Sequence, residues 1–222
     1  MSAIEIETPH GPARAHLHPS DEARAALVLG HGAGGGVEAP DLVAATEAGA
    51  AEGVSVALVE QPYRVAGKRS PASAPRLDAA WIAAVDHLVA GELSGLPLIV
   101  GGRSLGARVA CRTLEETGGV AVLCLAFPLQ PPARKGKPPP PDRLGELDAV
   151  EVPTLVVQGE RDRFGMPPEG PRRTVVAVPG DHGLKADLDA VAQAVRARLP
   201  EVLASAANGA TMSLRAPSGL KQ

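Results

Sequence analysis

The sequence predicts one α/β domain with a mostly parallel central sheet, an N-terminal antiparallel hairpin and helices on both faces. Apolar runs of strand length alternate with helical segments along most of the 222 residues, which is typical of a parallel sheet. The run AALVLG (25–30) is apolar throughout, as expected for a strand covered on both faces. Residues 3–18 alternate apolar and polar side chains around a turn with Pro and Gly, which indicates the hairpin.

The other elements are predicted in order from the same kinds of pattern. A helix begins at Pro40, a residue suited to the first turn, and stops at Gly53. A second helix has apolar residues at helical spacing, namely Leu77, Trp81, Val85 and Leu88. The remaining predicted strands are 54–60, 96–102, 120–127, 154–159 and 173–178, and the helices are 40–53, 74–91, 104–118 and 184–199.

Two segments lie outside this alternation. Residues 130–143 are basic and rich in proline, and they are too few to fold alone, so we predict a surface loop and no cap domain. Residues 204–222 lack periodicity and are predicted to form a flexible tail. A single domain over residues 1–203 remains.

Composition argues against several classes of function. A formal charge of −3 and an aromatic content of 2% offer neither a basic surface nor stacking platforms for nucleic acid. No signal peptide is predicted, and no run approaches the roughly 18 apolar residues of a membrane span. Cys111 and Cys124 fall in apolar segments, so we expect free buried thiols and a cytoplasmic protein.

A candidate nucleophile lies in the motif Gly102-x-Ser104-x-Gly106, between a predicted strand and a predicted helix. A serine on such a sharp turn has a strained backbone, and the residues two before and two after it crowd one another unless both are glycine. The turn presents the hydroxyl above the sheet, beside the N–H groups of the helix N-terminus. The alternative is a glycine-rich turn with an incidental serine.

A nucleophilic serine needs a base, and the base needs an acid that orients it. Asp162 and His182 each follow a predicted strand by a short turn, at the sheet edge that carries Ser104. The order Ser, Asp, His is that of α/β-hydrolases. Glu160 and Asp181 compete for the role of the acid, but Glu160 precedes the turn and Asp181 adjoins His182 too closely. A solvated loop histidine is the alternative for His182.

The loop LGHGAGGG (29–36) permits two interpretations. Its glycines spell G-x-G-x-x-G, and Glu60 ends the next strand, as in a dinucleotide-binding oxidoreductase. However, the helix signal begins only at Pro40, and His31 places a bulky ring between the first two glycines. In a serine hydrolase the same loop supplies the oxyanion hole.

For that oxyanion hole we predict two backbone N–H groups, those of Ala33 and Leu105, with Gly34 in reserve. Glycines beside them allow close approach to a developing alkoxide. This interpretation also uses the serine, the acid and the histidine, which the dinucleotide interpretation leaves without a role.

Several segments resemble the small, lidless α/β-hydrolase proteins of the testis-expressed-protein type, which are related to dienelactone hydrolase. Between positions 29 and 185 these segments read, in order, LGHGAGGG, QPYR, GGRSLGAR, FPLQPPARKGKP, QGERDRFG and GDHGLK. The resemblance implies the α/β-hydrolase fold and the roles of Ser104, Asp162 and His182. It implies little about substrate. Some eukaryotic relatives act in chromatin complexes, and dienelactone hydrolases use cysteine where this chain has serine.

Together these features predict a cytoplasmic serine hydrolase that cleaves a small-molecule ester, thioester or similar acyl bond. A non-catalytic interaction protein on the same fold is the alternative. Arg64, Arg103 and Arg134 are candidate substrate contacts, although Arg103 fits a structural brace better and the other two could serve solubility. No cofactor is expected. His16 and His18 share a face of the hairpin, but no third ligand accompanies them, so no metal site is predicted.

Overall fold

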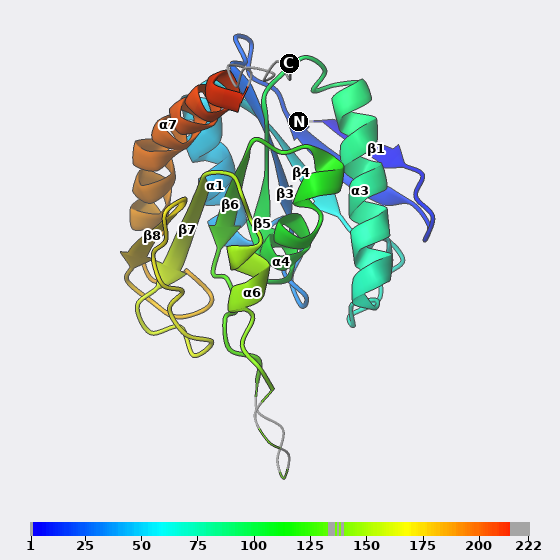
Figure 1. Cartoon of the computed structure of the whole chain (residues 1–222). Helices are drawn as coiled ribbons and strands as arrows, with labels where there is room; N and C mark the ends of the chain where they lie inside the picture. The colour runs from blue at the N-terminus through cyan, green and yellow to red at the C-terminus, as the bar shows by residue number, and fades with distance from the viewer. Residues whose placement is uncertain (1, 133–135, 137, 139, 214–222) are drawn as a thin grey trace, which may run out of the picture.

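A computed structural model describes residues 2–132, 136, 138 and 140–213, and its strands form one twisted sheet (Figure 1). Within these residues the strand order is β1-β2-β4-β3-β5-β6-β7-β8. The first hairpin and the β2–β4 pair are antiparallel, and the other pairs are parallel. The strands are β1 Ser2–Ile6, β2 Ala13–His18, β3 Ala25–Gly30, β4 Val54–Glu60, β5 Leu98–Arg103, β6 Ala121–Leu125, β7 Thr154–Gly159 and β8 Arg173–Val178.

Helices cover both faces of the sheet (Figure 1). Helices α1 and α7 pack on one face, and α3, α4 and α6 pack on the other. The central strands β3 and β4 are buried along almost their whole length, which explains their continuous apolar runs. The helices are α1 Pro40–Ala51, α2 Pro62–Val65, α3 Ala74–Ala90, α4 Leu105–Arg112, α5 Leu114–Thr117, α6 Leu144–Asp148 and α7 Leu188–Ser213.

The predicted α/β architecture is confirmed, with local differences in the helices. The helix predicted at 104–118 divides into α4 and α5 at Thr113, whose Oγ1 donates to the Val109 carbonyl at 2.8 Å, a contact that bends helices. The last helix continues past Pro200 into the predicted tail, because Leu199 and Val202 remain buried against the sheet layer. Residues 214–222 lie outside the described part of the chain.

The segment between β6 and β7 contains α6 and, among its described residues, no cap domain. No helix in the described part of the chain is long and apolar enough to cross a membrane. The parallel strands β3, β5, β6, β7 and β8 have their carboxyl ends at one edge of the sheet, and the candidate site forms there.

Candidate active site

Ser104 lies on the sharp turn between β5 and α4. Its backbone has φ 52° and ψ −102°, a strained conformation for a residue with a side chain that costs roughly 1–3 kcal/mol. A Cβ added at Gly102 or Gly106 would collide with the carbonyl oxygen of Gly30 in β3. The glycines of the motif are therefore required because α4 and β5 meet the backbone of β3 without any side chain between them.

The structure brings the predicted serine, histidine and aspartate together. The Nε2 atom of His182 lies 2.9 Å from Ser104 Oγ, and Nδ1 lies 2.7 Å from Asp162 Oδ2. The side chain of Asp162 is fully buried, whereas that of His182 is 19% exposed. Since an ionised carboxylate can only accept a hydrogen bond, Nδ1 carries the proton and Nε2 presents a lone pair to the serine hydroxyl.

Gln158, a residue that the sequence reasoning missed, holds Asp162 in place. Its Nε2 donates to Asp162 Oδ2 at 2.8 Å and to the Phe127 carbonyl at 3.0 Å. The N–H of Phe164 donates to the other oxygen, Oδ1, at 2.9 Å. The Phe164 ring also meets the His182 ring edge to face, with centroids 4.5 Å apart. A buried glutamine at the end of an apolar strand was the available signal.

The two competing acids lie elsewhere. Glu160 and Asp181 are both exposed. Asp181 uses Oδ1 to accept the N–H of Gly183 at 2.8 Å, in a turn beside the histidine. The geometry therefore favours Asp162 as the partner of His182.

The candidate oxyanion donors lie beside the serine. Ala33, Gly34 and Leu105 line the same open cavity, of about 320 Å³, as Ser104 and His182. Leu105 is the first residue of α4, so its N–H has no acceptor within the helix and is directed out of the N-terminus.

Two buried aromatic side chains orient the peptides of this loop. His31 Nε2 accepts the N–H of Gln61 at 3.1 Å, so Nδ1 carries the proton and donates to the Gly32 carbonyl at 2.8 Å. The Tyr63 hydroxyl donates to the Ala33 carbonyl at 3.0 Å. Because a trans peptide holds C=O and N–H on opposite sides, these contacts also direct the N–H groups of Ala33 and Gly34.

Burial keeps both aromatic side chains neutral. It lowers the pKa of His31, which is 2% exposed, while the hydrogen bond to the Gly32 carbonyl opposes the shift and the nearby Arg64 charge adds to it. Burial likewise raises the pKa of Tyr63 to about 12, so the hydroxyl keeps the proton that it donates. The loop is thus held by two buried donors, the His31 Nδ1–H group and the Tyr63 hydroxyl.

Arg103 connects the serine turn to two other loops. Its Nε lies 2.8 Å from Asp41 Oδ2 in the first turn of α1, and its Nη2 donates to the His182 carbonyl at 3.0 Å. Burial raises the pKa of the fully buried Asp41 carboxyl, and the Arg103 charge opposes that shift. A Cβ at Gly32 would lie 2.6 Å from Arg103 Nη1, which explains the second glycine of the loop. Arg103 borders the cavity, but its guanidinium is used as a brace.

The glycine loop does not have the arrangement of a dinucleotide site. Gly30 is buried in β3, where an added Cβ would lie 3.2 Å from the Trp81 ring, and α1 begins ten positions later at Pro40. Glu60 contacts His16 at 2.9 Å in the hairpin, where Arg14 lies 3.7 Å from it.

The other residues singled out from the sequence lie away from the cavity or outside the described residues. Arg64 lies on α2 and is not among the described residues that line the cavity, and Arg134 lies outside the described residues. His16 pairs with Glu60, and in the described part of the chain no three His, Cys, Asp or Glu side chains could together hold a metal. Cys111 and Cys124 are buried and free, with sulfur atoms 3.7 Å apart.

Comparisons with known proteins agree with this architecture. Est1E from Butyrivibrio proteoclasticus has 18% identity, a TM-score of 0.74, and coverage of 92% of this chain and 100% of that chain. An α/β serine hydrolase without lid from Xanthomonas campestris has 17% identity, a TM-score of 0.69, and coverage of 90% and 94%. Dienelactone hydrolase from Anabaena variabilis has 18% identity, a TM-score of 0.69, and coverage of 90% and 97%.

At these identities the structural likeness concerns the fold alone. No protein of curated function matches the sequence significantly. Residues 23–187, however, match the family model described as an alpha/beta hydrolase domain, which covers most of the chain. The chain therefore belongs to the α/β hydrolase family.

Proposed function

We propose that this protein is a serine hydrolase that cleaves a carboxylic ester, thioester or similar acyl bond through an acyl-enzyme. The observation that carries the proposal is the unbroken chain of contacts from Ser104 Oγ to His182 and on to the buried Asp162, with spacings of 2.9 and 2.7 Å. These distances support the roles of nucleophile, base and orienting acid. The resemblance to lidless hydrolases of the testis-expressed-protein type implies the same roles for Ser104, Asp162 and His182.

In the first step, Ser104 Oγ attacks the acyl carbon while His182 Nε2 takes the hydroxyl proton. Asp162 stabilises the imidazolium and stays ionised. The N–H groups of Leu105 and Ala33 receive the carbonyl oxygen as it becomes an alkoxide. His182 then returns the proton to the leaving alcohol or thiol. Water attacks the acyl-enzyme by the same route and releases the acid.

The comparisons support an acyl substrate without identifying it. Structural neighbours include Est1E with ferulic acid bound, an esterase domain from a Rhodothermus marinus protein and a thioesterase domain from the curacin biosynthetic pathway. The cavity is about 320 Å³, at the lower end of the range of small-molecule sites, roughly 300–1,000 Å³. We therefore propose a small acyl substrate.

Active-site labelling tests the proposal. A fluorophosphonate should label the protein covalently, and 4-nitrophenyl esters of increasing chain length should be hydrolysed. Ser104→Ala should abolish both and retain the circular dichroism spectrum and melting temperature of the parent. Ser94→Ala, a serine in the turn after α3, is the matched control and should retain both signals. Turnover by Ser104→Ala above the rate in buffer would refute the assignment, and a silent wild type would favour an interaction protein.

A further inference from the structure

The cavity beside Ser104 is lined by arginines and apolar groups. Its described lining includes no Asp or Glu side chain, although the whole chain has a formal charge of −3. The apolar part comes from residues such as Leu105, Pro128 and Phe164. The arginines that line it are Arg103, Arg108, Arg143 and Arg163.

Two of the four positive charges are neutralised within the protein. Arg103 pairs with the buried Asp41, as described above. Arg108 makes two contacts to the Glu146 carboxylate, with Nε at 2.8 Å and Nη2 at 2.5 Å. Glu146 also lies 3.7 Å from Arg112, which has its own partner in Asp78. Asp41, Glu146 and Asp78 are thus paired with arginines other than Arg143 and Arg163.

Arg143 is held in position without a carboxylate partner. Its Nη1 donates to the Pro128 carbonyl and its backbone N–H donates to the Leu129 carbonyl, both at 2.9 Å. No described carboxylate lies within 4.0 Å of its guanidinium. Partial burial and then the adjacent charge of Arg108 lower the pKa of Arg143, and the Glu146 carboxylate opposes that shift from beyond ion-pair distance.

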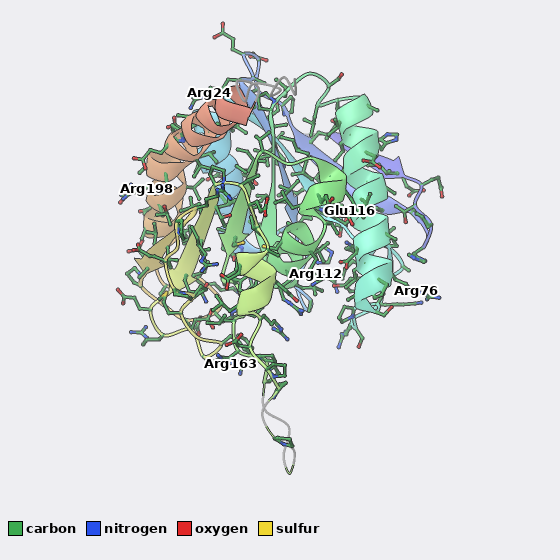
Figure 2. All side chains as sticks on the ribbon, in the orientation of Figure 1. Arg24, Arg76, Arg112, Glu116, Arg163 and Arg198 are labelled. Atoms are coloured by element: carbon green, nitrogen blue, oxygen red, sulfur yellow. The ribbon has the colours of Figure 1, made fainter. Side chains whose placement is uncertain are left out.

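Arg163 places a second unneutralised charge close to the reacting groups. Its guanidinium carbon lies 4.8 Å from the centroid of the Phe164 ring, and that ring packs against His182. Arg163 follows directly on Asp162 in the chain, so the loop that supplies the acid also supplies this charge. Figure 2 shows Arg163 at the end of the molecule where the chain leads into α6. No described carboxylate lies within 4.0 Å of it either.

We propose that the substrate is a short ester or thioester that carries a carboxylate in addition to its scissile bond, and that Arg143 and Arg163 bind this carboxylate. The inference rests on the proposed serine hydrolase function. A carboxylate is planar and accepts two parallel hydrogen bonds from a guanidinium fork. Ser104, Arg143 and Arg163 line the same cavity, so a substrate bound there would contact both the nucleophile and the arginines.

Matched pairs of esters test the proposal. One pair is 4-nitrophenyl hydrogen adipate and 4-nitrophenyl methyl adipate, which differ in the charge of the acyl part. The other pair is 3-acetoxybenzoate and its methyl ester, which differ in the charge of the leaving group. In at least one pair we expect kcat/KM to be about tenfold higher for the charged ester, since hydrogen bonds to charged groups are stronger than those between neutral groups. The preference should shrink as salt is added.

Variants assign the preference to the two arginines. Arg143→Gln and Arg163→Gln should each reduce the ratio of charged to capped kcat/KM several-fold, and Arg143→Lys should retain more of it than Arg143→Gln. Arg198→Gln is the control, because Arg198 pairs with Glu201 on the exposed side of α7 (Figure 2) and should leave the ratio unchanged. Arg163 is exposed, so its variant remains informative if Arg143→Gln fails to fold.

The outcomes separate the two proposals. If the wild type hydrolyses both esters of each pair equally well, the anionic substrate is wrong and the serine hydrolase stands. If the preference for the charged ester survives both glutamine variants, Arg143 and Arg163 do not bind the carboxylate, and the proposed site is wrong while the serine hydrolase stands. If no ester of either pair is hydrolysed and no fluorophosphonate label appears, the hydrolase proposal itself fails.

Discussion

The serine turn and the glycine loop lie beside each other at the same cavity, yet they are held in place by opposite means. The serine turn depends on absent side chains, because Gly102 and Gly106 bring two backbones into contact with Gly30. The glycine loop depends on buried polar side chains, because His31 and Tyr63 donate to its carbonyls. Steric exclusion fixes the first region and hydrogen bonding fixes the second. An added side-chain atom should therefore destabilise the serine turn, whereas loss or protonation of a hydrogen-bonding side chain should destabilise the glycine loop.

The largest expected effect comes from Arg103, which joins the serine turn to α1 and to the His182 loop and lies against Gly32 of the glycine loop. Arg103→Met removes the guanidinium and leaves the buried Asp41 carboxylate unpaired, so the free energy of unfolding should fall by about 3–5 kcal/mol in urea titrations. If the variant folds, its kcat should fall by a larger factor than its KM rises, because the His182 loop loses the hydrogen bond to its carbonyl.

Two further variants make the Arg103 result specific. Adding Asp41→Asn should restore part of the stability, since it removes the unpaired charge. Arg24→Met is the surface control: Arg24 is half exposed and 3.3 Å from Glu52, so its loss should cost less than about 1 kcal/mol. Equal losses for Arg103→Met and Arg24→Met would show that Arg103 is no brace.

The next largest effect concerns the serine turn. Gly106→Ala inserts a Cβ into the carbonyl oxygen of Gly30, and relief requires α4 to move away from β3. We expect a loss of about 1–3 kcal/mol in the free energy of unfolding and a displaced Ser104 hydroxyl, measured as slower fluorophosphonate labelling. Gly35→Ala, in open space on the glycine loop, should change stability by less than about 0.5 kcal/mol. A tolerated Gly106→Ala would contradict the close-packing explanation.

The smallest effect is the pH dependence that His31 gives to the glycine loop. Burial lowers the pKa of His31 below its ordinary value of 6.5. Between the lowered pKa and pH 6.5, the unfolded state therefore binds more protons at this histidine than the folded state does. The contribution of His31 to the free energy of unfolding should be fully present above pH 6.5. It should decline as the pH falls below that value, by less than about 1.4 kcal/mol per pH unit.

Urea titrations between pH 8 and pH 5 would measure this slope. His31→Gln is less stable throughout because it loses hydrogen bonds, but its stability should depend less on pH over the same range. Equal slopes for the two proteins would show that His31 does not link the loop to pH.

Much of the fold was predictable because it follows local pattern. Alternation of apolar runs and helical segments predicted the sheet and its antiparallel hairpin, and both are confirmed. Helix ends were less predictable, because Pro200 signals a stop that burial of Leu199 and Val202 overrides. The short helices α2 and α6 were missed, since four or five residues carry too little periodicity.

The candidate site was predictable only where topology applies. Parallel strands have their carboxyl ends at one edge, so the positions of Ser104, Asp162 and His182 after three strands were enough to expect them together. No comparable rule predicts that Gln158 supports Asp162. Its role depends on the path of the loop around Phe127 and Gly165, whose carbonyls it also binds.

By itself, the sequence determined the period of each element, the glycines at the serine turn and the order of the three candidate catalytic residues. Each of these depends on neighbours within a few positions or on a general rule of sheet topology. Only the tertiary structure decided which charges are neutralised, for example that Arg103 and Arg108 pair with carboxylates while Arg143 and Arg163 have no carboxylate within 4.0 Å in the described chain. Charge pairing acts between residues that are distant in sequence, over a few ångströms, and only packing brings such residues that close.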